Sequence, residues 1–460
     1  MKKAGAKEAN NRKTVFADFF EKNKNVEFMR CQLTDIAGNL REVTVTKEQI
    51  GSTGITTVDG SSVFGKIIPP TESDMVLVPD TSTLFMVPWS PDTAQVICDV
   101  FHPAEKEGDT LKPFKGCSRG ILKQVVKKME NLIKRQHPKM KISRVKALFA
   151  PELEFLLLPA EYDASNIHLD PNLKNDHYFV PPESRVNETL KTITRHLGVV
   201  ALKKEKFHTE VATYQCEIGI GHGNVLRIAD GTMTAKDIIS TVAEKNSLRA
   251  SFIPKFNQNV NGSGMHVHIN ISGVIDGKEV NLFYDPRKPD GLSDLGKKFI
   301  AGLLKYADEV TSLTNSTTIS YKRLVPGAEA PTRISWDWLN RTALCRGHSK
   351  GTTKVRVEYR APDPMCNPYL GFSALLLAGL AGIEQNLKLS PPDKRNLYHD
   401  HDGVEELPGN LAEALLLTQK SKMLRKGMGD FIIDTLFMLG MKNWREHSQS
   451  VTDWDIKKYL

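Results

Sequence analysis

Short segments that alternate apolar and polar residues fill the first hundred residues of the chain. Such segments lie at 26–33, 43–45 and 75–78. Clusters of Gly, Pro, Asp and Ser separate them, which is typical of short β-strands joined by turns. We therefore predict a small β-rich domain. A polar stretch rich in Gly and Lys follows at 108–116, and we place the boundary there, dividing the chain into residues 1–110 and 111–460.

From residue 117 onward, segments with the period of an amphipathic helix alternate with strand-like segments. The predicted helices are 118–135, 189–197, 235–248, 293–313, 371–387 and 411–444. The segment 146–158 is predicted as a strand, so the second part of the chain mixes both element types. The most apolar run, 372–383, is shorter than the roughly 20 residues of a membrane span, and we expect a buried helix there and no membrane partner.

Composition narrows the class of protein. The 460 residues include 62 Lys and Arg against 54 Asp and Glu, a small excess without the basic blocks and interleaved aromatics of a nucleic-acid binder. The six cysteines are scattered with no C-x-x-C pair, which favours free thiols in a reducing compartment. The basic start lacks the apolar core of a secretion signal. We expect a cytoplasmic protein that does not bind nucleic acid.

Three segments place charged or metal-ligating side chains on alternate residues. They are Glu152 and Glu154, His266 and His268, and the run 356–360. Alternate residues of a strand share a face, so each segment predicts a strand with one apolar and one charged face. A buried charged face must be compensated. Together the three faces predict a polar cleft suited to metal ions and phosphates.

Further carboxylates extend this set. Hard cations such as Mg²⁺ and Mn²⁺ take carboxylate oxygens, and an imidazole suits Mn²⁺. Two adjacent metal sites are predicted from Glu152, Glu154, Glu210, Glu217, Glu358 and His266. Taken singly, each glutamate is better explained as a solvated edge residue, and a lone strand histidine is more often structural. The pair in one apolar strand, and the glycine-rich turn 261–264 before the histidines, favour the metal interpretation.

Arginines cluster in one short section of the chain. They are Arg323, Arg333, Arg341, Arg346, Arg356 and Arg360. A basic surface face is the plain alternative, but several lie among apolar or aromatic residues, as in 336–341. Guanidinium groups match phosphate and carboxylate oxygens. Combined with carboxylate-bound metals, they predict metal-assisted phosphoryl transfer from a nucleotide. The sequence has no Walker loop and no nucleophile elbow.

These segments resemble, in order and over nearly the whole chain, the motifs of the glutamine synthetase family, in its class I bacterial and archaeal form. The matching segments are 59–62, 72–75, 151–155, 178–182, 261–268, 321–327, 329–331, 340–341, 357–364, 367–369 and 451–454. The resemblance implies an α+β fold. It would comprise a small N-terminal β-grasp domain and a large C-terminal catalytic domain, with a curved antiparallel sheet flanked by helices, as in guanido kinases.

The resemblance also implies an activity. This is ATP-dependent ligation of ammonia to the γ-carboxylate of L-glutamate through γ-glutamyl phosphate, giving glutamine, ADP and phosphate. Two or more Mg²⁺ or Mn²⁺ ions would bind per site, and the chain would form a homo-oligomer, a dodecamer with active sites between subunits. One alternative is a γ-glutamyl ligase of the family that uses an organic amine or polyamine. Another is a non-catalytic structural or regulatory paralogue, against which the complete metal-ligand set argues.

Residue roles follow from the resemblance alone. The first metal would be held by Glu154, Glu210 and Glu217, and the second by Glu152, His266 and Glu358. Catalytic roles fall to Asp59, which takes a proton from ammonium, to the flap residue Glu329, and to Arg341. Glutamate and ammonium would contact Tyr178, Asn261, Gly262, Arg323, Arg360 and Ser62. The nucleotide would contact Glu205, His268, Arg346 and Arg356. Asp59 and Tyr178 fit a small cation pocket and so favour ammonia.

Five positions depart from the family pattern without removing a metal ligand. They are Tyr214 for glycine, His222 for an aromatic residue, Asn270 for serine, Ala328 for tyrosine and Ala381 for aspartate. The first three bear on the shape of the nucleotide and amine pockets. Ala328 precedes the flap glutamate and bears on flap closure.

Overall fold

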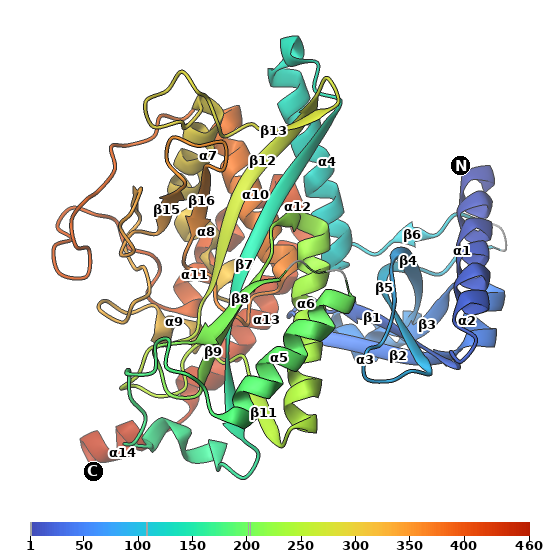
Figure 1. Ribbon diagram of the computed structural model, residues 1–460, viewed down its shortest axis with the longest axis horizontal. Helices are drawn as coiled ribbons and strands as arrows, with labels where there is room; N and C mark the ends of the chain where they lie inside the picture. The colour runs from blue at the N-terminus through green and yellow to red at the C-terminus, as the bar shows by residue number, and fades with distance from the viewer. Residues whose placement is uncertain (1, 107–108, 201, 203) are drawn as a thin grey trace.

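The protein has a smaller and a larger part (Figure 1), seen here in a computed structural model. It describes all residues except 1, 107–108, 201 and 203, and leaves out the side chains of 2–9, 66, 164, 204 and 205. No helix in the described ranges is both long enough and apolar enough to cross a membrane.

The smaller part is built on one sheet with strand order β2-β1-β5-β4-β3, and β6 pairs with β5. Its strands are β1 (Phe28–Thr34), β2 (Leu40–Thr46), β3 (Thr56–Asp59), β4 (Asp74–Met86), β5 (Thr93–His102) and β6 (Lys112–Pro113). β1 and β5 are parallel, and the other described pairs are antiparallel. The strands predicted at 26–33, 43–45 and 75–78 are confirmed as β1, β2 and β4.

Helices of this part are α1 (Lys2–Lys22), α2 (Lys47–Thr53) and α3 (Gly60–Phe64), with short 3₁₀ turns at Gly65–Ile67 and Pro70–Glu72. We did not predict the helix α1 from the sequence. The division of the chain near residue 110 stays a prediction. β6 belongs to the first sheet and α4 opens the larger part.

The larger part contains a sheet of ten strands with the main order β14-β15-β16-β12-β7-β9-β8. The strands are β7 (Arg144–Pro159), β8 (Lys204–Thr209), β9 (Gln215–Ile220), β10 (Gly223–Asn224), β11 (Leu248–Ser251), β12 (Met265–Ile275), β13 (Lys278–Asn281), β14 (Trp336–Asp337), β15 (Cys345–His348) and β16 (Arg356–Tyr359). The strand predicted at 146–158 is confirmed as β7. β14 and β15 are parallel, so the sheet predicted as antiparallel is mixed at one edge.

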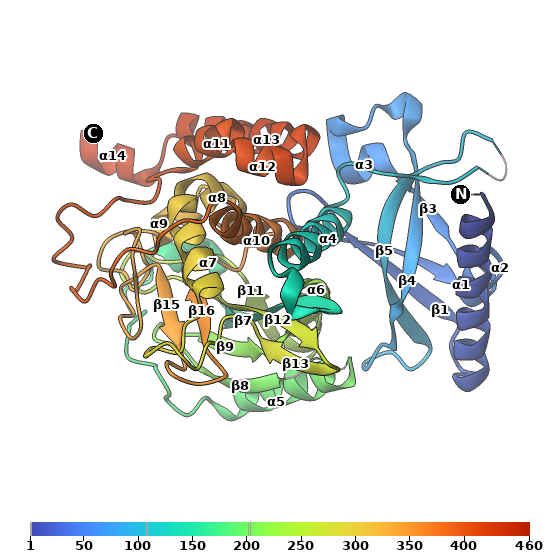
Figure 2. The same ribbon diagram turned by 90° about the horizontal axis from the view of Figure 1, so that it is seen from above.

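Helices cover this sheet (Figure 2). They are α4 (Ser118–Gln136), α5 (Ser184–Val199), α6 (Val225–Lys245), α7 (Asp294–Lys305), α8 (Ala307–Thr314), α9 (Ser320–Arg323), α10 (Pro368–Glu384), α11 (Leu411–Lys420), α12 (Lys422–Met428), α13 (Asp430–Gln449) and α14 (Asp453–Tyr459), with 3₁₀ turns at Pro138–Met140 and Ala164–Leu169. All residues of α10 except its last are buried, as its apolar sequence predicted. It packs between α4 and α7, and α11 to α13 lie outside this layer.

Most predicted helices have different limits in the structure. The helix predicted at 189–197 spans Ser184–Val199, and the helix predicted at 371–387 spans Pro368–Glu384. The segment 293–313 is two helices that meet at Tyr306, and 411–444 is three helices. In the second case the Ser421 side chain caps α12, and Gly429 adopts a φ of 99° that few other residues tolerate. The helix predicted at 235–248 begins earlier, after the cap Asn224, and ends at Lys245. The Asn224 side chain accepts a hydrogen bond from the Leu226 N–H and so caps the start of this helix.

A buried ionic network joins the two parts. Arg119 of α4 donates hydrogen bonds to Asp80 (2.8 Å) and Asp99 (3.0 Å) of the first sheet and to Asp230 of α6 (2.7 Å). Tyr369 of α10 donates to the same Asp230 (2.8 Å). The main apolar core runs through both parts. The two sheets therefore belong to one framework.

Candidate active site

Strand register brings the charged faces together. β12 lies between β7 and β16, with His266 opposite Glu152 and His268 opposite Glu358. On the other side of β7, Glu154 pairs with Glu217 of β9. Strands adjacent in a sheet are about 4.8 Å apart, so side chains at paired positions on one face can contact each other directly.

A first cluster gathers carboxylates around one histidine. His208 Nε2 lies 3.2 Å from Glu217 Oε1, and His208 Nδ1 lies 3.5 Å from Glu210 Oε1. Ligand atoms of these three residues all lie within 4.8 Å of one another. Beside them, Glu154 accepts hydrogen bonds from Gln215 Nε2 and from the Gly264 N–H, both at 2.9 Å.

The electrostatics of this first cluster favour a bound cation. Burial, together with the charges of Glu210 and Glu217, raises the pKa of Glu154 well above its usual range. Burial and Glu217 raise the pKa of Glu210 to about 7. Buried carboxylates repel one another when ionised. A divalent cation among them would relieve this repulsion, and the oxygen-rich donor set fits Mg²⁺ or Mn²⁺.

A second cluster lies on the β12 side. His266 Nδ1 is 3.4 Å from Glu152 Oε2 and 3.5 Å from Glu358 Oε1. Glu358 is only 1 % exposed. Burial raises the pKa of Glu358, but Arg360 and a hydrogen bond from His348 outweigh it and hold the pKa well below its usual range. Two carboxylates and one imidazole are a donor set suited to Mn²⁺.

One cavity of about 290 Å³ joins the two clusters. The predicted residues that line it are Glu152, Glu154, Tyr178, Glu210, Glu217, Asn261, Gly262, His266, Arg323, Glu329, Arg341, Arg346, Glu358 and Arg360. The sequence reasoning missed four polar lining residues: Lys206, His208, Gln215 and His348. His208 could have been found, because it alternates with Glu210 at the end of one strand. His348 likewise alternates with Arg346, on the four-residue strand β15.

Several predicted residues lie elsewhere. Asp59 and Ser62 are not among the described residues that line this cavity. Asp59 caps α3 and accepts hydrogen bonds from the Ser61 N–H (2.9 Å) and from Ser62 Oγ (2.9 Å), and the hydrogen bonds from Ser61 and Ser62 lower its pKa. Arg333 pairs with Glu406, so it does not join the other arginines at the cavity. The side chain of Glu205 lies outside the described residues.

The arginines that line the cavity differ in how deeply their side chains are buried. Arg323 is 2 % exposed, and its guanidinium donates to the Ala361 carbonyl (2.6 Å) and the Arg360 carbonyl (3.3 Å), which fixes its position. Arg341 is largely exposed and approaches Glu329, with Nη2 3.5 Å from Oε2. Glu329 adopts a φ of 56°, a strained conformation for a residue with a side chain, of the kind that clusters at functional sites.

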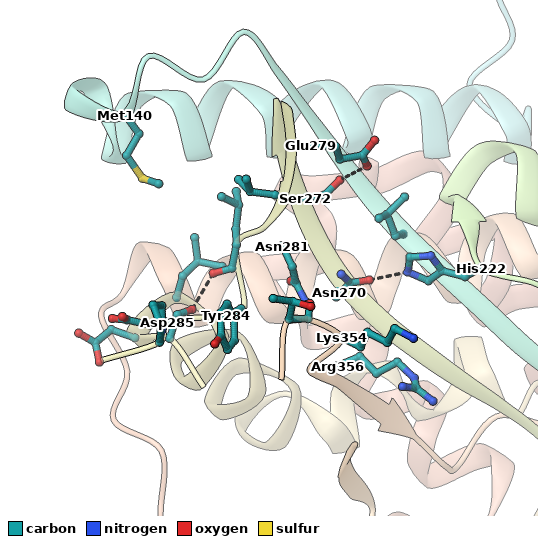
Figure 3. Close-up of a pocket in the computed structure, with 18 of the residues that line it drawn as sticks. Met140, His222, Asn270, Ser272, Glu279, Asn281, Tyr284, Asp285, Lys354 and Arg356 are labelled. Atoms are coloured by element: carbon teal, nitrogen blue, oxygen red, sulfur yellow. Dashed lines mark hydrogen bonds between the residues drawn. The ribbon is translucent and has the colours of Figure 1, made fainter. Parts of the chain in front are cut away.

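A larger cavity of about 1110 Å³ adjoins the first. In Figure 3, His222 and Asn270, two of the departures from the family pattern, form a hydrogen bond at its wall (2.7 Å). His268 also lines it. His268 Nδ1 accepts from Arg356 Nε (3.3 Å), and its Nε2 lies 3.2 Å from Glu152 Oε1. His268 therefore links the larger cavity to the second cluster. The volume suits a nucleotide-sized ligand.

Comparisons with known proteins agree on one family. The family model "Glutamine synthetase, catalytic domain" matches residues 116–459, and "Glutamine synthetase, beta-Grasp domain" matches residues 25–103. A glutamine synthetase of Thermotoga maritima is 37 % identical over 450 residues, covering 95 % of this chain and 97 % of the relative. One of Methanocaldococcus jannaschii is 35 % identical over 462 residues, with 96 % of each chain covered.

Solved structures give the same match. One titled "GmaS/ADP complex-Conformation 1" superimposes with a TM-score of 0.83 and 26 % identity, over 97 % of this chain and 99 % of that one. A second, titled "Apo GmaS without ligand", gives a TM-score of 0.81 and 25 % identity, over 96 % and 98 %. The arrangement of both parts of the chain is thus shared with these proteins.

Proposed function

The chain belongs to the glutamine synthetase family of ATP-dependent ligases, and we propose that it joins ammonia to the γ-carboxylate of L-glutamate. The observation that carries the proposal is the convergence of two carboxylate and imidazole clusters with Arg323, Arg341, Arg346 and Arg360 on one cavity. A carboxylate is a poor electrophile. Transfer of the γ-phosphoryl group of ATP makes it γ-glutamyl phosphate, which ammonia attacks to give glutamine and phosphate.

The two clusters fit a pair of Mg²⁺ or Mn²⁺ ions. We assign Glu154, Glu210 and Glu217, which line the cavity, to one ion. We assign Glu152, His266 and Glu358, whose ligand atoms lie within 4.8 Å of one another, to the other. Such ions supply charge neutralisation and Lewis-acid polarisation when bound. The chain's own arginines act with them, because guanidinium groups at the wall stabilise charge that develops on the transferring phosphoryl group. Arg341 and Arg346 are the residues we assign to this task.

Glutamate is proposed to bind against Asn261, Gly262, Arg323 and Arg360. Gly262 packs so closely that a Cβ there would lie 2.4 Å from the Pro254 carbonyl and 2.9 Å from Arg323 Cγ, so only glycine fits. Gln215 Nε2 donates to the Gly262 carbonyl (3.1 Å). This packing gives a rigid wall on which the amino acid can be oriented for phosphoryl transfer.

Glu329 is proposed to act as a flap. It lies two residues after Gly327, which has a φ of 81°, and its carboxylate faces Arg341 at the cavity. Closure of this segment over bound glutamate would exclude water, which otherwise hydrolyses the acyl phosphate. Ala328, a small residue in place of the family's tyrosine, also lines the cavity and leaves the flap less side-chain volume to move.

The ammonium site is proposed to need a second copy of the chain. Tyr178 and Glu210 line the cavity, whereas Asp59 and Ser62 are not among its described lining residues. We propose that Asp59 and Ser62 of a neighbouring subunit complete the site, in a ring oligomer that stacks into a dodecamer. Asp59 would then accept the proton that ammonium must lose before it can attack.

The larger cavity is proposed to take ATP. His268, Arg346 and Arg356 would contact its phosphates, and Glu205 is a further proposed contact. The structural match to a protein solved with ADP supports this assignment. We place the activity in the cytoplasm, because all six cysteines are free thiols, which suits a reducing compartment.

A panel of amines tests the proposed function. Purified protein, ATP, Mg²⁺ or Mn²⁺ and glutamate are incubated with ammonium, methylamine, ethanolamine or putrescine. Phosphate release and product mass are then measured. We expect glutamine, and phosphate release that depends on both glutamate and ammonium. Turnover only with the organic amines would replace the proposal by an organic-amine ligase. No turnover with any amine, in an intact oligomer, would favour the non-catalytic paralogue.

A further inference from the structure

Gln215 is a residue of the active-site cavity that the proposed mechanism leaves without a role. It begins β9, opposite Leu156 of β7, and is only 2 % exposed. A buried side-chain amide must find partners for both its donor and its acceptor, because leaving either one unpaired is costly. The partners of Gln215 belong to the first carboxylate cluster and to the wall that we propose binds glutamate.

Backbone partners determine which way the Gln215 amide points. Oε1 lies 3.1 Å from the Ala212 N–H, which can only donate, and Nε2 lies 3.1 Å from the Gly262 carbonyl, which can only accept. Exchanging the amide oxygen and nitrogen would place donor against donor and acceptor against acceptor. Ser263 Oγ also lies 3.1 Å from Nε2. The donor end of the amide therefore faces the first cluster.

Gln215 Nε2 also donates to Glu154, one of the three carboxylates that we assign to the first metal ion. Glu154 Oε2 accepts this hydrogen bond and a second one from the Gly264 N–H, both at 2.9 Å. Each carboxylate oxygen has two lone pairs in its plane, so these two donors occupy Oε2. No described residue donates a hydrogen bond to Oε1. Oε1 is therefore the Glu154 atom left to bind a cation.

The backbone of Gln215 holds a second carboxylate residue of the same cluster. Its carbonyl accepts a hydrogen bond from the Glu210 N–H (2.8 Å), and its N–H donates to the Ala212 carbonyl (3.0 Å). These two bonds close the turn between β8 and β9, in which Tyr214 adopts a φ of 66°. A substitution at Gln215 removes only the side-chain hydrogen bonds, so the role of the amide can be tested while the turn is kept.

We propose that Gln215 is a positioning residue, which holds Glu154 in its metal-binding orientation and supports the Gly262 carbonyl in the glutamate wall. The inference rests on the proposed function, because that function assigns the metal and glutamate sites. Removing a partner that orients a metal ligand typically weakens metal binding by about 10- to 100-fold. Since one amide supports both sites, its loss should weaken the binding of both the first metal ion and glutamate. ATP should be unaffected, because Gln215 is not among the described residues that line the larger cavity.

The competing explanation is that Gln215 only fills space in the folded protein. Two variants distinguish the explanations. Gln215→Met keeps the length of the side chain and removes the amide, whereas Gln215→Asn keeps an amide but withdraws it by one methylene from Glu154. The matched control is Gln124→Met, which changes an exposed glutamine of α4. Gln124 is not among the described residues lining either cavity.

Binding of Mn²⁺ is measured by equilibrium dialysis without nucleotide, on proteins whose oligomer is confirmed by gel filtration. The first ion is identified as the one whose affinity falls in Glu154→Gln. We expect both Gln215 variants to bind this ion about tenfold or more weakly. In steady-state assays the KM for glutamate should rise while the KM for ATP stays at the wild-type value. Gln124→Met should match the wild type throughout.

A double variant tests whether the amide acts through Glu154. When Gln215→Met is added to Glu154→Gln, the affinity for Mn²⁺ should fall little further, because the carboxylate that the amide positions is already lost. A full additional loss would overturn the inference, and so would wild-type Mn²⁺ affinity in Gln215→Met and Gln215→Asn. The dialysis needs no turnover. An inactive wild type whose Mn²⁺ binding still depends on Gln215 would therefore contradict the proposed function alone.

Discussion

The carboxylate cluster around Glu210 should destabilise the protein whenever metal is removed. Burial and Glu217 raise the pKa of Glu210 from its usual 4.5 to about 7. At 1.36 kcal/mol for each pKa unit, the ionised form is disfavoured by about 3 kcal/mol in the folded state. The variant Glu210→Gln keeps the shape of the side chain without the charge. It should raise the free energy of unfolding of the metal-free protein by about this amount at high pH.

The sign of the pH dependence follows from linkage. Because folding raises the pKa of Glu210, the protonated form favours the folded state. Its contribution to stability is fully present below pH 4.5 and is lost as pH rises through the window up to about 7. The gain from Glu210→Gln should therefore grow from about 1 kcal/mol at pH 5.5 to about 3 kcal/mol at pH 8.5.

Thermal and urea unfolding in EDTA at pH 5.5 and 8.5 measure this gain. The exposed Glu244→Gln in α6 is the control and should change stability little at either pH. Saturating Mn²⁺ should offset most of the gain at pH 8.5. Wild-type protein at a Mn²⁺ concentration of about a hundredfold Kd gains about 2.7 kcal/mol of unfolding free energy, and a variant that lacks one ligand gains much less. A loss of metal-free stability in Glu210→Gln, or a gain independent of pH, would refute the reasoning.

Three further variants test the proposed mechanism. Glu358→Gln should retain the oligomer and circular-dichroism spectrum but lower kcat by about a thousandfold; wild-type rates would contradict the metal assignment. Glu329→Ala should leave the flap unable to exclude water, so that phosphate release exceeds glutamine formation in a coupled assay; a ratio of one would argue against the flap role. Asp59→Asn and Glu358→Gln, each inactive alone, should recover about a quarter of wild-type activity when unfolded and refolded together, because mixed rings contain interfaces with both intact residues. No recovery would show that the site is not shared between subunits.

Much of the catalytic face follows from local rules. Alternation along a strand is enough to put Glu152 and Glu154, or Glu358 and Arg360, on a common face, and all four line one cavity. The apolar run of α10 is likewise sufficient to predict its burial. Helix limits were less predictable. Ser421 and Gly429 divide 411–444 into three helices, but each residue is also compatible with a continuous helix until its packing is known.

The amino-acid sequence by itself determined which residues can carry charge on a strand face, which run is buried, and, through ordered motifs, the family. These three properties depend on side-chain chemistry and on patterns of apolar and polar residues that repeat every few positions along the chain. Only the tertiary structure decided that His208 lies beside Glu210 and Glu217. It also decided that Arg333 forms a salt bridge with Glu406 and that His348 is hydrogen-bonded to Glu358. Those contacts depend on the register between strands distant in the chain, and a register is set by the packing of the whole sheet.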